Sequence, residues 1–186
     1  MRHDSLPPAI LGASAWLGPE ESTKQHWQHE LTDDELRELE AAATNCLQAS
    51  ADLTQIRRSN FVLPTLGPRL RAIHDALLQG CGFALIRSLP VRQWSHELTA
   101  AAFFGLGTHL GNPRPQNSKG HVLGHVIDMG LEATDPNVRI YQTHERQTFH
   151  TDSSDIVGLV CLQQAKAGGD SALVSSNTLY NQMRAS

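Results

Sequence analysis

The spacing of apolar residues changes near residue 111, and this change limits the folds that the chain can adopt. Before it, apolar residues recur at helical spacing; after it, they occur only in short or alternating runs. The first part predicts helices over residues 32–50, 64–79 and from 95 to the glycines at 105–111. The second part predicts strands at residues 122–127, 138–143, 156–162 and 172–174. Helices followed by a block of strands are typical of an α+β protein.

Local signals support these elements. Thr32 is a candidate N-cap because acidic residues fill the turn after it, where they interact favourably with the helix dipole. Ser95 is expected to cap the third helix in the same way. Residues 83–86 form a short apolar run between glycine and proline, which predicts a buried strand. Ser176 or Asn177 is expected to cap a last helix.

Length and composition fit one soluble globular domain. The 186 residues are 40% hydrophobic and 18% charged, which argues against disorder. The net charge is −4 and no basic cluster exceeds Arg57-Arg58, so we expect no nucleic-acid partner. No apolar run has the length of a signal peptide core or a membrane span, so we expect a cytoplasmic protein without a membrane partner. Three widely spaced cysteines are expected to be reduced and buried: Cys46, Cys81 and Cys161.

The first 31 residues are rich in loop-forming residues and contain two tryptophans. Pro, Gly and Trp interrupt any regular spacing there. Because large aromatic side chains are seldom left exposed, Trp16 and Trp27 are expected to anchor this arm onto the main body.

Residues 149–155, Phe-His-Thr-Asp-Ser-Ser-Asp, contain a candidate metal-ligand pair. On a strand, His150 and Asp152 would point to the same face. An imidazole and a carboxylate placed this way are two ligands of the two-His-one-carboxylate arrangement that holds Fe(II) with open positions. The alternative interpretation is a strand that ends in a turn, with these polar side chains bound to loop backbone.

Three motifs in order resemble the taurine dioxygenase (TauD/TfdA-like) family of Fe(II)/2-oxoglutarate-dependent oxygenases. They are the Gly-Phe-Ala-Leu-Ile-Arg-Ser-Leu-Pro stretch at 82–90, the Phe-His-Thr-Asp stretch at 149–152, and Ala-Lys-Ala-Gly-Gly-Asp-Ser at 165–171. The first departs from the family at Ser88, where Gly is usual. The resemblance covers about residues 60 to 186.

The resemblance implies a fold and a chemistry. The fold is a double-stranded β-helix, a jelly roll of the clavaminate-synthase type with N-terminal helices, here incomplete. The chain then divides into residues 1–60, an N-terminal arm and helix, and 61–186, the N-terminal portion of the oxygenase domain. His150 and Asp152 match two catalytic iron ligands, and Ser171 matches a hydroxyl residue that contacts 2-oxoglutarate. The implied reaction uses O2, converts 2-oxoglutarate to succinate and CO2, and hydroxylates a small-molecule substrate.

The chain departs from the family beyond the metal pair. No histidine follows His150, whereas the family has a third ligand downstream and then an arginine that pairs with 2-oxoglutarate; only Arg184 remains, in the expected last helix. We therefore expect a truncated oxygenase that turns over poorly or not at all by itself. The alternative third ligand, His144, would lie about 20 Å from His150 along an unbroken strand.

Three functions stay open. The first is a 2-oxoglutarate-dependent dioxygenase acting on a small, anionic metabolite; the second is a non-catalytic remnant that serves as a binding or dimerisation module, which leaves homo-oligomerisation open. The third is a zinc hydrolase using His144, His150 and Asp152, although the His-Glu-x-x-His signature is absent. Some residues could line a substrate pocket by position, although each also fits an ordinary loop or strand role: Arg87, Gln116, Asn117, Arg139, Tyr141 and Gln142.

Overall fold

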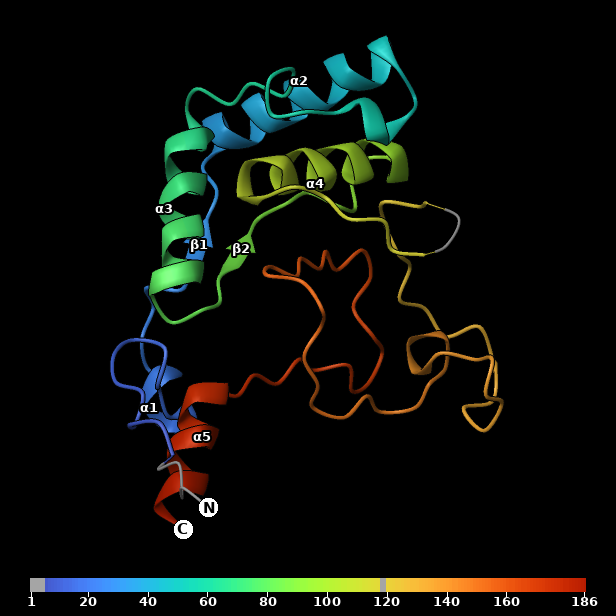
Figure 1. Cartoon of the computed structure of the whole chain (residues 1–186). Helices are drawn as coiled ribbons and strands as arrows, with labels where there is room; N and C mark the ends of the chain where they lie inside the picture. Colours follow the sequence, from blue (N-terminus) through green and yellow to red (C-terminus); the bar gives the residue numbers. More distant parts are fainter. Residues whose placement is uncertain (1–5, 118–119) are drawn as a thin grey trace.

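Three helices pack together at the centre of the computed structural model, which describes residues 6–117 and 120–186. They are α2 (Asp33–Ala49), α3 (Leu66–Gln79) and α4 (His96–Leu110), and in Figure 1 α2 lies above α4 with α3 at one end. Their apolar faces meet in one core. Its largest fully buried side chains are Phe61, Leu39, Leu66, Leu70 and Ile73. All three predicted helices are therefore confirmed, and the short turn η1 (Leu53–Gln55) connects the first two.

Side-chain caps fix the first residues of these helices. The Thr32 hydroxyl accepts a hydrogen bond from the Glu35 amide, and the Glu35 carboxylate accepts one from the Thr32 amide, which is a capping box. Ser95 accepts from the Leu98 amide at the start of α4. Helix α3 is capped differently: the Glu38 carboxylate, from α2, accepts 2.8 Å hydrogen bonds from the amides of Thr65 and Leu66. This cap joins the two helices directly.

A two-stranded parallel sheet lies beside the helices. Strand β1 (Gln28–Glu30) pairs with β2 (Leu85–Arg87), with His29 opposite Ile86. Strand β2 begins two residues later than predicted, and it is not buried as predicted, because Leu85 and Arg87 are exposed. Strand β1 was not predicted because its three residues carry no apolar run. Ser88 follows β2 with φ +74°, a left-handed conformation that favours glycine.

The tryptophans anchor the N-terminal arm, as predicted. Trp16 Nε1 donates to the Cys81 carbonyl at 2.8 Å, and both indole rings contact Phe83, with centroids 5.3 and 5.4 Å away. The arm contains α1 (Gly18–Glu21) and runs into β1. Its first five residues lie outside the described part of the chain.

The predicted β-rich region is the main error of the sequence analysis. Within residues 120–175, all of which the structure describes, no strand forms, and residues 140–142 form the single turn η2 (Ile140–Gln142) instead. Two of the predicted strands do approach each other, through hydrogen bonds from Ile127 N to Tyr141 O (3.1 Å) and from Met129 N to Gln142 O (2.9 Å). No continuous ladder follows, because strand formation requires a partner edge and a covered apolar face, and this region has neither.

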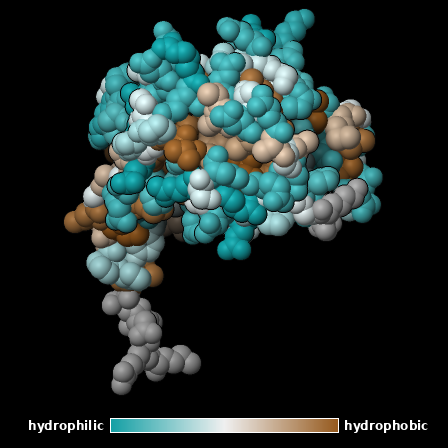
Figure 2. All heavy atoms as spheres, turned by 90° about the horizontal axis from the view of Figure 1, so that it is seen from above, coloured by the Kyte–Doolittle hydropathy of each residue, from teal (hydrophilic) through white to brown (hydrophobic). Residues whose placement is uncertain are grey.

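The apolar residues of this region lie on the surface. Between residues 120 and 174 Thr143 is the one buried residue, and many large apolar side chains are exposed, among them Val126, Ile127, Phe149, Val157, Leu159 and Leu173. On the face shown in Figure 2, hydrophobic atoms form separate patches among hydrophilic ones. Cys161 is also exposed, so its predicted burial is wrong, whereas Cys46 and Cys81 are buried as expected.

The last helix, α5 (Ser176–Ala185), packs against the N-terminal arm (Figure 1). Ser175, one residue before the predicted cap, accepts a hydrogen bond from the Thr178 amide and donates to the Ser14 carbonyl. The Asn181 amide group bonds both the N–H and the carbonyl of Ile10. Tyr180 and Arg184 donate to the Pro7 carbonyl. A network of polar contacts therefore joins the N-terminal arm to α5.

Candidate functional site

The predicted metal pair lies in an exposed segment without regular secondary structure. The His150 ring is oriented by two contacts: Nδ1 lies 2.8 Å from the Thr148 carbonyl, and Nε2 lies 3.1 Å from the Gln147 side-chain nitrogen. Because a carbonyl only accepts, Nδ1 must carry the proton and donate it. The Nε2 lone pair then faces outward and accepts from the Gln147 amide. A neutral imidazole held in this tautomer by a backbone carbonyl is the form in which histidine binds metals.

The other two predicted site residues, Asp152 and Ser171, are also exposed, and they do not come together with His150 in a formed site. Asp152 lies in an irregular stretch just before a bend at residues 153–155 rather than on a strand, and Ser171 lies in an irregular segment just after the positive-φ glycines Gly168 and Gly169. The strand on which His150 and Asp152 were expected to share a face is therefore absent. No third histidine, cysteine or carboxylate among the described residues joins this pair in a metal-sized group.

The alternative ligand sets are not assembled either. His144 Nε2 lies 3.7 Å from Glu145 Oε1, and the described residues contain no group that brings His144 together with His150 and Asp152. This finding removes the support for His144 as third iron ligand and for a zinc hydrolase built on the same three residues.

The donor set at residues 150–152 nevertheless fits ferrous iron in part. A neutral imidazole nitrogen and a carboxylate are the ligand types that Fe(II) takes in oxygenases. Both side chains are exposed to solvent and free of an ion pair in the described part of the chain. Two protein ligands are one fewer than the usual three, so the pair is a half-site.

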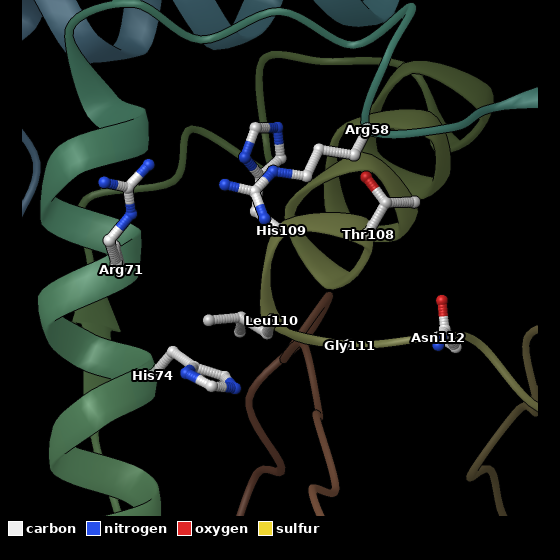
Figure 3. A pocket seen from close by; sticks show the side chains of 8 residues that line it. All are labelled: Arg58, Arg71, His74, Thr108, His109, Leu110, Gly111 and Asn112. Carbon is white, nitrogen blue, oxygen red and sulfur yellow. The ribbon is translucent and has the colours of Figure 1, made fainter.

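A separate cavity of about 280 Å³ lies between the C-terminal end of α4 and α3 (Figure 3). Arg71 and His74 reach it from α3, while Arg58 reaches it from the segment before α3. The remaining lining residues come from the end of α4 and the turn after it: Thr108, His109, Leu110, Gly111 and Asn112. No acidic residue lines the cavity, so its two arginines give it a positive potential that favours anions.

The sequence analysis missed this cavity. Of its lining residues, the sequence analysis names only Arg58, as half of the basic pair Arg57-Arg58. Arg71 and His74 are three residues apart on α3 and so share a face, which is a signal that could have been read. His109 is fixed by a 2.8 Å contact from Nε2 to the Phe61 carbonyl. The pocket residues considered from sequence lie elsewhere; Arg87, for example, faces Glu30 at 3.9 Å.

No helix in the described part of the chain has both the length and the apolar character needed to cross a membrane.

Comparison with known proteins places these observations in a family context. Residues 49–186 match the model of the "Taurine catabolism dioxygenase TauD, TfdA family". The chain is similar to the "Taurine hydroxylase-like protein SAT17" of Stachybotrys chartarum, with 29% identity over 91% of this chain and 46% of that protein. It is also similar to the "FR-33289 synthase" of Streptomyces rubellomurinus, with 26% identity over 96% of this chain and 53% of that protein. The chain therefore spans about half the length of these relatives.

Proposed function

The chain belongs to the taurine catabolism dioxygenase TauD, TfdA family, and from this membership we propose that it contributes the N-terminal portion of an Fe(II)/2-oxoglutarate-dependent dioxygenase. In this proposal residues 61–186 form the first part of the oxygenase domain and residues 1–60 form the arm and helix before it. The jelly roll arises when the apolar runs between residues 122 and 174 pair with strands that the described residues do not supply. Such pairing would cover the side chains that are now exposed.

The observation that carries the proposal is the state of the His150 ring. The Thr148 carbonyl accepts a hydrogen bond from Nδ1, so Nε2 keeps a lone pair; the Gln147 amide donates to that lone pair, and a metal ion would take the place of this contact, two residues before the Asp152 carboxylate. His150 and Asp152 would hold the iron, with the carboxylate offsetting part of its charge. Ser171 would donate its hydroxyl proton to 2-oxoglutarate. When bound, Fe(II) supplies open positions for the 2-oxo acid and O2, and so makes oxidative decarboxylation and C–H hydroxylation accessible.

We propose that the substrate is a small anion. The support comes from the cavity between α3 and α4, whose lining includes two arginines and two histidines but no carboxylate. An anionic group on the substrate would be attracted to such a surface, and each arginine can offer a pair of parallel N–H donors to it.

Metal binding tests the proposed ligands. Mn(II), a redox-stable substitute for Fe(II), is titrated into the chain with 2-oxoglutarate present, and the free ion is followed by electron paramagnetic resonance. We expect His150→Ala and Asp152→Ala each to weaken binding by at least about 10-fold. His144→Ala and Asp155→Ala, which alter the same residue types in the same segment, should leave it unchanged. Equal binding by all four variants would refute the ligand assignment.

Turnover tests the expectation that this chain alone is inactive. Because two protein ligands hold the metal, we expect little or no succinate when Fe(II), 2-oxoglutarate and O2 are supplied. Substrate hydroxylation by the isolated chain would contradict this expectation.

The second candidate function is a non-catalytic binding or dimerisation module. The observation in its favour is that the helical core of α2, α3 and α4 is complete and capped, whereas the half-site is exposed and unassembled. Binding of Mn(II) together with 2-oxoglutarate distinguishes the two functions. The dioxygenase requires this binding, whereas a non-catalytic module does not.

A further inference from the structure

A second group of metal-ligand side chains lies far from the half-site in sequence. Glu21 ends α1, His26 lies in the loop before β1, and Cys81 lies in the turn after α3. One ligand atom from each, a carboxylate oxygen, an imidazole nitrogen and the thiol sulfur, lies within 4.8 Å of the other two. The group therefore joins the N-terminal arm to the helical core.

The Glu21 carboxylate is the strongest sign that this group has a ligand. Glu21 is only 3% exposed, and its Oε1 atom is buried without a hydrogen-bond partner. His26 Nε2 lies 3.2 Å from that oxygen, but the contact does not meet the geometry of a hydrogen bond. Burying an unsatisfied carboxylate oxygen is costly. A cation bound to Oε1 would remove that cost.

The protein holds both sides of the group in place. Trp27 Nε1 donates to the Glu21 carbonyl at 3.3 Å, and Trp16 Nε1 donates to the Cys81 carbonyl at 2.8 Å. Both indoles pack on Phe83, so the two backbones are fixed against one another. His26, by contrast, has a side chain that is 53% exposed. Its ring can therefore adjust to an ion that enters from solvent.

We propose that Glu21, His26 and Cys81 form a binding site for a divalent cation of the Zn²⁺ type. Zinc takes oxygen, nitrogen and sulfur ligands at about 2.0–2.3 Å in a tetrahedron, which puts ligand atoms about 3.3–3.8 Å apart. The three ligand atoms lie within 4.8 Å of one another, so they must approach by up to about 1 Å to reach that range, and rotation of the exposed His26 ring would supply part of this movement. Three protein ligands leave the fourth position for water. The thiolate ligand favours Zn²⁺ over Mg²⁺ or Ca²⁺, which prefer oxygen.

Binding of the ion involves proton release and competition with a neighbouring lysine. The Cys81 thiol loses its proton to the buffer as the metal–sulfur bond forms. Lys24 Nζ lies 2.7 Å from Glu21 Oε2, the other carboxylate oxygen, so Oε1 can bind the ion while this ion pair persists. The ammonium charge still repels the cation, and so it limits affinity.

Cobalt(II) is the probe that tests the site, since it replaces Zn²⁺ and gives a near-ultraviolet charge-transfer band when a thiolate binds it. We expect the band in the chain with its native residues, and its loss in Cys81→Ser. Cys161→Ser is the matched control, because Cys161 is an exposed thiol outside the group, and it should keep the band. His26→Ala should weaken Co(II) binding by at least about 10-fold, whereas His96→Ala, at another exposed histidine, should not.

Two further variants make the outcome decisive. Lys24→Gln removes the competing charge and should tighten Co(II) binding several-fold, an effect that a merely structural Glu21 would not produce. His150→Ala removes the half-site and should leave the sulfur band unchanged, so failure of one site is distinguishable from failure of the other. Absence of the band, or its persistence in Cys81→Ser, would overturn the proposal. Far-ultraviolet circular dichroism checks that each variant is folded.

Discussion

Ser88 has a backbone conformation that is unfavourable for any residue with a side chain. It occupies a left-handed conformation at φ +74°, where the family motif has glycine, and its hydroxyl donates to Glu30 across the small sheet. A residue with a Cβ atom loses roughly 1–2 kcal/mol in this conformation, and glycine does not. The hydroxyl contact offsets part of that cost.

At Ser88 we predict that glycine gives a more stable protein than alanine, which is the reverse of the order found within helices. We expect Ser88→Gly to be more stable than Ser88→Ala by about 1 kcal/mol in urea unfolding, since both variants lose the hydrogen bond but only alanine keeps the backbone strain. At Gly107, within α4 and with open space around it, Gly→Ala should instead stabilise the chain. If alanine is preferred at both positions, the strain at Ser88 is not real.

The cysteines should differ sharply in reactivity. Burial raises the pKa of the Cys46 thiol above its ordinary value, so less of it is thiolate at a given pH, whereas Cys161 is exposed. Near pH 8, we expect iodoacetamide to modify Cys161 much faster than Cys46. The rate for Cys46 should keep rising at higher pH, where its thiolate forms. Peptide mass spectrometry measures both rates, and equal rates in folded protein would contradict the burial of Cys46.

Helix α3 depends on a side chain from another helix. Glu38 accepts hydrogen bonds from two amides at the start of α3, whose own N-cap, Thr65, makes no side-chain cap. We expect Glu38→Ala to lower the free energy of unfolding by about 1–2 kcal/mol, because charged caps at this helix end are among the stronger ones. Glu40→Ala, at an exposed position on the same helix, should change it by less than about 0.5 kcal/mol. Urea unfolding compares the two, and similar losses would refute the cap.

At the level of elements, the three core helices and, within two residues, strand β2 could be predicted, whereas β1 was missed and the strands predicted between residues 122 and 174 do not form. Thr32 and Ser95 carry the information for a helix start within three residues, so α2 and α4 begin where the sequence indicates. The cap from Glu38 could not be read, because it acts across 27 residues. An apolar run such as residues 156–162 forms a strand only when another strand pairs with it, and the run itself does not specify that partner.

The candidate functional site, too, could be predicted only in part from the sequence. The sequence around His150 and Asp152 was enough to propose them as metal ligands, and that assignment stays a prediction. The contacts that orient the His150 ring come from Gln147 and Thr148, which lie within three residues of it. The cationic cavity depends on Arg58, Arg71 and His109, which only the packing of α3 against α4 brings together.

At the scale of the whole molecule, packing is uneven. The core lies in residues 31–106, while Thr143 is the one buried residue between 120 and 174. We expect limited proteolysis to cut first within residues 120–174, because local opening there exposes little apolar surface. Helices α2, α3 and α4 should survive as one fragment. Mass spectrometry of the products locates the cuts, and a first cut inside α2 or α4 would contradict this distribution.

The contact between α5 and the N-terminal arm also bears on how the chain folds during synthesis. Its hydrogen bonds join residues 161 to 177 positions apart. Contacts over such separations close the longest loops and form slowly. The arm leaves the ribosome well before its partner helix, so it must wait until the residues 161 to 177 positions further along have been synthesised. Pulsed hydrogen exchange should therefore show protection at α2 and α4 before α5.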